Sequence, residues 1–300
     1  MPTFESFVCQ INSCAKNPVL IIPNPGCNCE GGCVDPRVCA CLDRSQGRNY
    51  DPTDNTLLQL RIPRPRFDRP VYECNDRCSC RKEACRNRVV QNQCQDTSAL
   101  STFDAGAKGR GVRAASHFRQ GEFVCVFAGH YMNHNIAEVH ALADKQLEKW
   151  DHAYVVAVQE FVANDCPPAS INIVNGAHDV TDTLTELPLS SLINHSCLPN
   201  LTIFPIRTET VQPLLAFFAI SDIWTGQELT YDYLEKSREI NAFSGKDFLC
   251  GSRNCRDTHN VLALYYQKWI FTLETNMLTW VHKNIIAHKS RQTYCDYDEI

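Results

Sequence analysis

The sequence has 300 residues, 44% hydrophobic and 21% charged, so it is long and apolar enough for one large or two modest folded domains. Its 29 Lys and Arg against 34 Asp and Glu give a net charge of −5, which excludes a protein that grips nucleic acid through bulk positive charge and better suits a basic partner. The start lacks a basic segment followed by a long apolar one, and no apolar run approaches 18 residues, so we expect neither a secretory signal nor a membrane-spanning helix.

Composition changes along the chain in a way that separates two kinds of structure. Residues 1–22 predict a short arm or a first strand. Residues 23–95 are rich in Cys, Pro, Gly, Asn and Asp and poor in apolar periodicity, so they need a source of stability other than a hydrophobic core. Within them, residues 42–73 predict a loop, because Pro63, Pro65 and Pro70 discourage a long helix.

From about Ser101 the sequence turns to short β-branched and aromatic runs broken by Gly and Asn, which predict many short strands. One helix is predicted over residues 134–149, where apolar side chains recur at helical spacing. The predicted strands are 122–128, 154–158, 170–174, 201–206 and 214–220.

Nine of the 18 cysteines lie in a short stretch with the spacing C-x-C-x3-C-x5-C-x-C, then 32 residues, then C-x3-C-x-C-x4-C. Without a secretory route, such density indicates metal rather than disulfides or scattered structural cysteines. Three tetrahedral zinc ions need twelve contacts, and nine sulfurs supply twelve if three of them bridge. The remaining charge of −3 could be offset by nearby Arg and backbone N–H groups. The predicted ligands are Cys27, Cys29, Cys33, Cys39, Cys41, Cys74, Cys78, Cys80 and Cys85.

The other nine cysteines divide into a second group and isolated residues. Cys197, Cys250 and Cys255 form the second group. Cys125 lies inside an apolar run and is most simply a small core residue. The others show no ligand spacing, and they are Cys9, Cys14, Cys94, Cys166 and Cys295.

Three further motifs follow, each with a plain structural alternative. Residues 108–112 (KGRGV) form a glycine-flanked turn that could approach a ligand closely or be only a turn. Residues 194–200 (NHSCLPN) follow an apolar pair and could hold a purine-like edge or form a satisfied polar turn. Residues 228–233 (ELTYDY) place two tyrosines on one strand face, where they could take part in a reaction or simply pack in the core.

In this order, the cysteine block, KGRGV, NHSCLPN, ELTYDY and C-x4-C resemble the SET-domain protein lysine methyltransferases that carry pre-SET and post-SET zinc modules. The resemblance covers about residues 23–258. The strings PVYECNDRCSC, CRNRVVQ and GEFVCVFAG are most similar to the SET domain fused to a mariner-type transposase in primates. The resemblance implies a mostly β chain with a β-clip fold and a pseudoknot, in which the NHSC segment threads beneath the loop that carries Tyr-Asp-Tyr.

The resemblance also implies how the chain is divided. An N-terminal arm (1–22) would be followed by a loop-rich three-zinc pre-SET module (23–95) and a SET catalytic domain (96–236). An atypical post-SET segment (237–260) and a C-terminal tail (261–300), which could be helical, would complete the chain.

The family transfers a methyl group from S-adenosylmethionine to a lysine amine, and the resemblance carries roles to matching residues. Tyr233 would be the catalytic tyrosine, and Tyr154 would line the cofactor and lysine pockets. Tyr231 would limit how many methyl groups the amine receives, so that mono- and dimethyl products are favoured. The cofactor would contact Tyr154 and the residues Lys108, Gly109, Arg110, Gly111, Val112, Asn194 and His195.

The sequence departs from the family pattern at three positions. The first post-SET cysteine is replaced by Phe248, so Cys197, Cys250 and Cys255 leave a fourth zinc one ligand short. An arginine–aromatic pair before NHS is replaced by Ser191 and Leu192. An acidic residue after the FAG strand is replaced by His130.

Two functions follow from these observations. The first is an S-adenosylmethionine-dependent methyltransferase that acts on a histone tail, for which histone H3 or the nucleosome is the expected partner. The second is a catalytically degraded SET module that acts as a chromatin-associated zinc scaffold. The family implies location in the nucleus on the chromosome, and we expect no sequence-specific DNA binding. The sequence leaves the oligomeric state open.

Overall fold

The structure is a computed structural model that describes residues 22–61, 69–132, 141–142, 145–146, 148–149, 154–161, 170–176, 187–233, 250 and 269–270. Strands predominate and the helices are short, as the sequence predicts. Residues 1–21 and nearly all of 234–300 lie outside the described part, and with them most of the predicted arm, post-SET segment and tail. None of the helices in the described part is long and apolar enough to cross a membrane.

The largest sheet has six strands, in the order β4-β10-β9-β11-β8, with β1 beside β9. Its centre is the antiparallel pair of β9 and β10, while β11 is parallel to both β8 and β9. The strands are β1 (Val71–Tyr72), β4 (Phe123–Val126), β8 (Asn194–His195), β9 (Leu201–Arg207), β10 (Leu214–Ala219) and β11 (Thr230–Tyr231).

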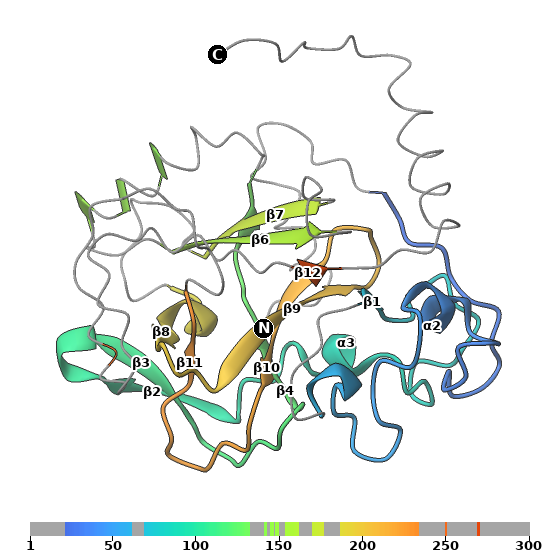
Figure 1. The fold of residues 1–300 in the computed structure, drawn as a ribbon, viewed down its shortest axis with the longest axis horizontal. Helices are drawn as coiled ribbons and strands as arrows, with labels where there is room; N and C mark the ends of the chain where they lie inside the picture. Colours follow the sequence, from blue (N-terminus) through green and yellow to red (C-terminus); the bar gives the residue numbers. More distant parts are fainter. Residues whose placement is uncertain are drawn as a thin grey trace, which may run out of the picture.

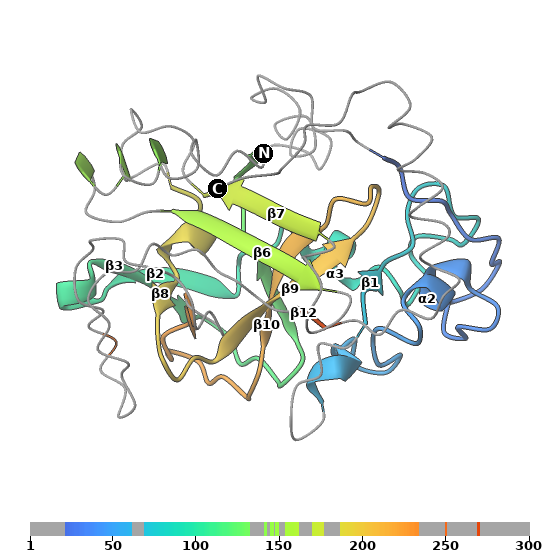
Figure 2. The ribbon, with the colours of Figure 1, turned by 45° about the horizontal axis from the view of Figure 1, so that its top comes forward.

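A second sheet of four strands has the order β12-β6-β7-β5, and β2 and β3 form a separate antiparallel pair. In Figures 1 and 2 the long strands β6 and β7 lie across β9 and β10, with β2 and β3 at one end of the molecule and the cysteine-rich segment at the other. These strands are β2 (Leu100–Asp104), β3 (Arg110–Ala114), β5 (His130–Tyr131), β6 (Val155–Phe161), β7 (Ser170–Asn175) and β12 (Trp269–Ile270).

All five strands predicted from hydrophobic runs are present, as β4, β6, β7, β9 and β10, with ends shifted by a few residues. The helix predicted over residues 134–149 is described only in part: residues 141–142, 145–146 and 148–149 are helical, and the others lie outside the described residues. The other helices among the described residues are short: α2 (Ala40–Arg44), α3 (Val89–Gln93), η1 (Leu58–Leu60), η2 (Gly106–Lys108) and η4 (Leu189–Leu192).

The main core fills the space around β9 and β10, where Phe204, Phe217 and Phe218 are fully buried. The nine cysteines form a separate buried cluster with Leu42. However, the cysteine-rich segment also contributes apolar side chains to the main core, and Val71 of β1 pairs with Ile206 of β9. Composition alone pointed to stabilisation by metal, whereas the structure shows that this segment is also held by the core it shares with the strands.

One buried ion pair joins the two sheets. Arg207 at the end of β9 donates from Nη2 to Glu160 Oε2 of β6 at 2.6 Å, and their side chains are 10% and 2% exposed. Burial opposes the Arg207 charge, but the adjacent Glu160 carboxylate outweighs this and raises the pKa of Arg207. The guanidinium also lies 5.4 Å from the centre of the Tyr72 ring.

Replacing Glu160 by Ala should lower the free energy of unfolding by about 3–5 kcal/mol, because it leaves the Arg207 charge buried without its carboxylate. Denaturant unfolding followed by circular dichroism measures this. The matched control is Asp35→Ala, which breaks the exposed pair with Arg37 and should change the free energy of unfolding far less, because water screens an exposed pair. Equal effects of the two variants would show that the buried pair does not hold the sheets together.

Candidate functional site

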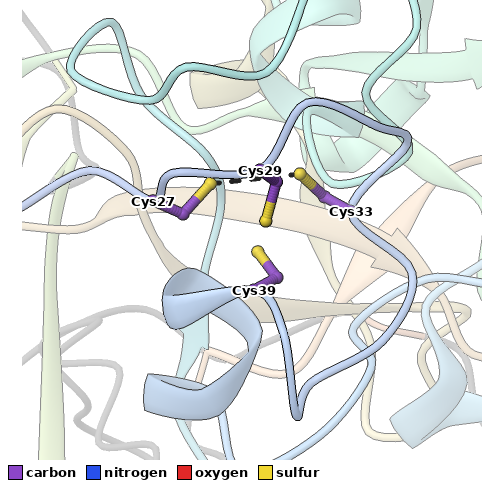
Figure 3. Close-up of side chains that lie close together, drawn as sticks. All are labelled: Cys27, Cys29, Cys33 and Cys39. Carbon is purple, nitrogen blue, oxygen red and sulfur yellow. Dashed lines mark hydrogen bonds between the residues drawn. The ribbon is translucent and has the colours of Figure 1, made fainter.

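The nine cysteines of residues 27–85 come together as one cluster, although 32 residues separate its two halves. Each is a free thiol, and the described part of the chain contains no disulfide. Figure 3 shows the sulfurs of Cys27, Cys29, Cys33 and Cys39 turned toward one point, with Cys39 immediately before α2. These four ligand atoms lie within 4.8 Å of one another, as the four ligands of one zinc ion require.

Sulfur atoms are shared between neighbouring groups of four. The other groups are Cys27-Cys39-Cys41-Cys74, Cys27-Cys74-Cys78-Cys80 and Cys33-Cys74-Cys80-Cys85. Cys27 and Cys74 each belong to three of the four groups, whereas Cys29 belongs to one. This overlap is the arrangement that bridging sulfurs between zinc ions require.

Hydrogen-bond donors surround the cluster and stabilise thiolates. Such donors were expected, because nine thiolates and three zinc ions leave a charge of −3. Arg44 Nη2 donates to Cys41 Sγ at 3.2 Å, and the backbone N–H groups of Asn75 and Cys27 donate to Cys78 Sγ at 3.2 and 3.3 Å. Burial raises the pKa of the Cys29 thiol to about 12. The Cys29 thiolate therefore needs a nearby cation, and the soft sulfur donors of the cluster fit zinc.

The second predicted metal group is brought together in part. Ligand atoms of His195, Cys197 and Cys250 lie within 4.8 Å of one another. Cys255 and Phe248 lie outside the described residues, so the structure does not test whether they complete this group.

Tyr231 and Tyr233 lie side by side, with ring centres 4.6 Å apart and exposed fractions of 4% and 3%. The Tyr233 hydroxyl donates to the Ile193 carbonyl at 2.8 Å. Burial, and then the nearby Tyr231, raises the pKa of Tyr233 well above its usual value. Both phenols are therefore neutral at physiological pH, because burial also raises the pKa of Tyr231. They can give and accept hydrogen bonds, but they are not bases.

The NHSCLPN and ELTYDY motifs are neighbours in the structure. Thr230 of β11 is paired with Asn194 of β8, and Tyr231 with His195. Asn200 holds the same segment, because its side chain donates to the Glu228 carbonyl and accepts the Thr230 N–H. This adjacency is what the expected pseudoknot requires.

Glu228 is a site residue to which the sequence assigned no role. Its carboxylate binds Lys108 Nζ at 2.7 and 2.9 Å and accepts from Asn194 Nδ2 at 3.0 Å. It thus joins two predicted cofactor residues from distant parts of the chain. The sequence did contain one indication of this role. Side chains alternate between the two faces of a strand, so Glu228 is expected on the same face as Thr230 and Asp232 and on the face opposite the two tyrosines.

The glycine turn packs directly on Asn194. A Cβ at Gly111 would lie 2.9 Å from Asn194 Nδ2 and 2.8 Å from the Phe103 ring, so any larger residue would have to displace these side chains. Gly109 adopts a φ of +74°, Arg110 is exposed, and Val112 is fully buried. Gly111 therefore allows a close approach, here by side chains of the protein, whereas Gly109 has no neighbour near it and instead supplies the positive φ of the turn.

Tyr154, at the start of β6, is half-buried against the main core. Burial raises its pKa, while the nearby Arg110 guanidinium opposes that shift, so Tyr154 and the glycine turn lie within electrostatic range. Tyr154 also contributes to the raised pKa of Tyr233, so the two tyrosines lie near each other. The structure thus brings the predicted catalytic and cofactor residues together, and their roles stay predictions.

The departures at Ser191 and His130 are accommodated differently. Ser191 is buried, and its hydroxyl donates to the Gly176 carbonyl at 2.9 Å, while Leu192 packs in the core. His130 begins β5 and pairs with Asn175 of β7. Ser191 and Leu192, which stand where the family has an arginine and an aromatic residue, therefore help to hold the fold together.

Two family models match the chain: the Pre-SET motif over residues 4–88 and the SET domain over residues 109–234. The mouse histone-lysine N-methyltransferase SETMAR is 35% identical over 248 residues, which are 77% of this chain and 72% of the relative.

Two solved structures are similar. The methyltransferase domain of human SETMAR has a TM-score of 0.64 and 30% identity, covering 84% of this chain and 86% of that one. KRYPTONITE in complex with mCHH DNA, an H3(1-15) peptide and S-adenosylhomocysteine (SAH) has a TM-score of 0.56 and 26% identity, covering 81% of this chain and 45% of that one.

Proposed function

The chain belongs to the SET-domain family of histone-lysine methyltransferases, and on that premise we propose that it methylates a lysine of the histone H3 tail through the residues around Tyr233. As a member of this family it is a histone-lysine N-methyltransferase that uses S-adenosylmethionine, has a zinc-binding cysteine cluster and acts on chromatin. The observation that carries the proposal is the buried Tyr231–Tyr233 pair beside Asn194 and His195. Histone H3 is supported by the H3 peptide in the KRYPTONITE complex, and the net charge of −5 suits a basic tail.

When bound, S-adenosylmethionine supplies an electrophilic methyl group next to a positively charged sulfur. A lysine attacks such a group only as the neutral amine, and its ordinary pKa is about 10.4. We propose that Tyr154, Tyr231 and Tyr233 form a narrow aromatic channel that disfavours the ammonium form by desolvation. The neutral phenols would then orient the amine through hydrogen bonds, and Tyr233, whose hydroxyl is held by the Ile193 carbonyl, would be the catalytic tyrosine.

For the cofactor we propose the surface formed by Lys108, Gly109, Arg110, Gly111, Val112, Tyr154, Asn194 and His195. The Asn194 side chain donates to Glu228 through its amide nitrogen, which leaves its amide oxygen to accept a hydrogen bond from a ligand. Glu228 would keep Lys108 and Asn194 in place.

For the metals we propose three zinc ions in the nine-cysteine cluster, with Cys27 and Cys74 among the bridging ligands. Cys197, Cys250 and Cys255 would hold a fourth ion only together with one further ligand, because Phe248 stands where the family has a cysteine. We propose the nucleus, on the chromosome, as the location, because the substrate is a histone.

A methyl-transfer assay tests the function directly. Zinc-loaded full-length protein with radiolabelled S-adenosylmethionine should label H3 tail peptides, and isothermal titration should detect cofactor binding. Labelling of other histones alone would overturn the H3 assignment. No binding at millimolar cofactor would instead favour the zinc scaffold that the departures at Phe248, Ser191 and His130 led us to consider.

Tyr231 should limit the number of methyl groups. Each added methyl group removes an N–H donor and displaces the hydroxyl or its bound water, at a cost on the order of 1 kcal/mol for one neutral hydrogen bond. A cost of 1.4 kcal/mol slows a step about tenfold, enough to separate successive transfers. We expect mono- and dimethyl products, and a shift toward trimethyl-lysine in Tyr231→Phe.

Mass spectrometry of the peptide products over time measures this shift. Efficient trimethylation by the unmodified enzyme, or identical products from Tyr231→Phe, would show that Tyr231 does not limit the product.

A further inference from the structure

Arg88 is a positive charge buried beside the cysteine cluster, immediately before α3. Its side chain is only 2% exposed. Nη2 donates to the Asn75 carbonyl and Nη1 to Gln91 Oε1 at 3.4 Å, while Nε is buried with no hydrogen-bond partner among the described residues. These partners are uncharged, and a buried charge is costly unless it is paired, so the guanidinium needs negative charge close by.

Two carboxylates lie near Arg88, and each has a closer cation. Asp76 lies 3.7 Å from Arg88 Nη1, but it is 60% exposed and binds Lys82 Nζ at 2.7 Å. The Glu209 carboxylate is within electrostatic range of Arg88, but it lies 3.9 Å from Arg77 and accepts the Asp76 N–H at 3.0 Å. The two exposed cations therefore pair with the two carboxylates and leave Arg88 without one of its own.

The negative charge that remains near Arg88 is that of the cluster. Nine thiolates and the three proposed zinc ions leave a charge of −3. Burial opposes the charge of Arg88, but the nearby Cys80, Cys85 and Cys74 outweigh this and raise its pKa, so the guanidinium lies beside one of the groups of four sulfurs. Arginine suits this place, because its guanidinium is always charged and is weakly hydrated.

Arg44 has the same relation to another part of the cluster. Its Nη2 donates to Cys41 Sγ at 3.2 Å, and Cys41 belongs to a different group of four sulfurs from Cys80 and Cys85. Cys29 accepts from no arginine in the described part of the chain, and its sulfur lies 3.7 Å from a backbone carbonyl. The two arginines therefore place positive charge at two separate parts of the cluster.

We propose that Arg88 is the buried counter-ion of the zinc cluster at Cys80 and Cys85, and that its charge strengthens the binding of the zinc held there. Arg44 has this role at Cys41. The inference rests on the proposed three-ion cluster and does not depend on methyl transfer. Since Arg88 directly precedes α3, whose first two residues are buried in the main core, the same residue links the metal cluster to that core.

Zinc affinity tests the role of the charge. Arg88→Met removes the charge and keeps an unbranched side chain, whereas Arg88→Lys keeps the charge. Competition with a chelator of known affinity should show at least one ion bound about 10- to 100-fold more weakly in Arg88→Met, the usual effect of losing a group that supports metal ligands, and Arg88→Lys should recover most of this loss.

The matched control for zinc affinity is Arg37→Met, in the same module. The Arg37 side chain is 88% exposed, so this variant should bind zinc as the unmodified protein does. Equal zinc affinities in Arg88→Met and Arg37→Met would overturn the proposal. An affinity as weak in Arg88→Lys as in Arg88→Met would also overturn it, because shape or hydrogen bonding, and not charge, would then explain the loss.

Alkylation of individual cysteines gives a local readout. A nearby positive charge makes a thiolate less nucleophilic, so its removal should speed the reaction of the adjacent sulfurs. In zinc-loaded Arg88→Met, treated with iodoacetamide and mapped by mass spectrometry, we expect faster alkylation at Cys80 and Cys85 than in the unmodified protein. The rate at Cys29 should change much less.

Arg44→Met should give the complementary pattern, with faster alkylation at Cys41 and little change at Cys80. This second variant tests the same principle at the other part of the cluster. Equal acceleration at all nine cysteines in both variants would show general loss of the fold and would overturn a local counter-ion role.

The outcomes for the two proposals differ. Metal analysis that finds fewer than three zinc ions in the unmodified protein would overturn the proposed cluster, and with it the charge that Arg88 is inferred to balance. Three ions in the unmodified protein, bound equally tightly in Arg88→Met, would overturn this inference alone.

Discussion

Replacing Tyr233 by Phe should lower the rate of methyl transfer about 100- to 1000-fold, equivalent to about 2.7–4 kcal/mol, the usual cost of losing one preorganised group that acts in the transition state. The ring packs against Tyr231 and His195, so the variant keeps its packing and loses only the hydroxyl. That hydroxyl is neutral, because burial raises the pKa of Tyr233, and the Ile193 carbonyl fixes its direction. Cofactor affinity should change much less than the rate.

Single-turnover methyl transfer to an H3 peptide measures the rate, and isothermal titration measures cofactor affinity. Tyr131→Phe is the matched control, because Tyr131 of β5 donates its hydroxyl to the carbonyl of Pro213, just before β10, and not to a residue of the proposed site. It should leave the rate unchanged. Near-normal turnover in Tyr233→Phe would show that another residue performs the catalytic role.

Replacing Cys74 by Ser should release more than one zinc ion and unfold the cysteine cluster. Cys74 is fully buried and belongs to three of the four sulfur groups, so its loss opens several sites at once. Structural zinc contributes about 10–16 kcal/mol of binding free energy in zinc-finger peptides, and this energy stabilises the fold. Metal analysis after gentle purification, together with thermal unfolding, measures both effects.

Two other cysteines provide a graded comparison. Cys29 belongs to one sulfur group, so Cys29→Ser should disturb one ion and lower the melting temperature less than Cys74→Ser. Cys94 belongs to none of the groups, and its thiol donates to the Gln91 carbonyl, so Cys94→Ser should keep all the zinc. Equal zinc loss in Cys74→Ser and Cys29→Ser would contradict a bridging role for Cys74.

Local patterns in the sequence were sufficient for several features. The strands β4, β6, β7, β9 and β10 could be predicted because their hydrophobic runs are short and are bounded by turn residues. The zinc cluster could be predicted because thiolate ligands recur at close spacing within two short segments. The place of Cys125 in the core followed from the apolar run around it, and its exposed fraction is 5%.

The resemblance named the tyrosines, Asn194 and His195, but not the bonds among them. Glu228 lies 120 residues from Lys108 and 34 from Asn194, and no local pattern indicates that one carboxylate binds both. The same holds for the hydrogen bond from the Tyr233 N–H to His195 Nδ1, which joins residues 38 apart in the sequence.

The sequence by itself therefore determined the short strands, the metal chemistry and the candidate residues, because each depends on spacing within a few positions of the chain. Only the tertiary structure decided how the cysteine-rich segment docks on the core, how Arg207 and Glu160 join the sheets, and which partners orient Tyr233. Those features depend on pairing between strands that are distant in the sequence. The physical reason is that burial and hydrogen-bond partners are properties of packed neighbours, which residue spacing does not record.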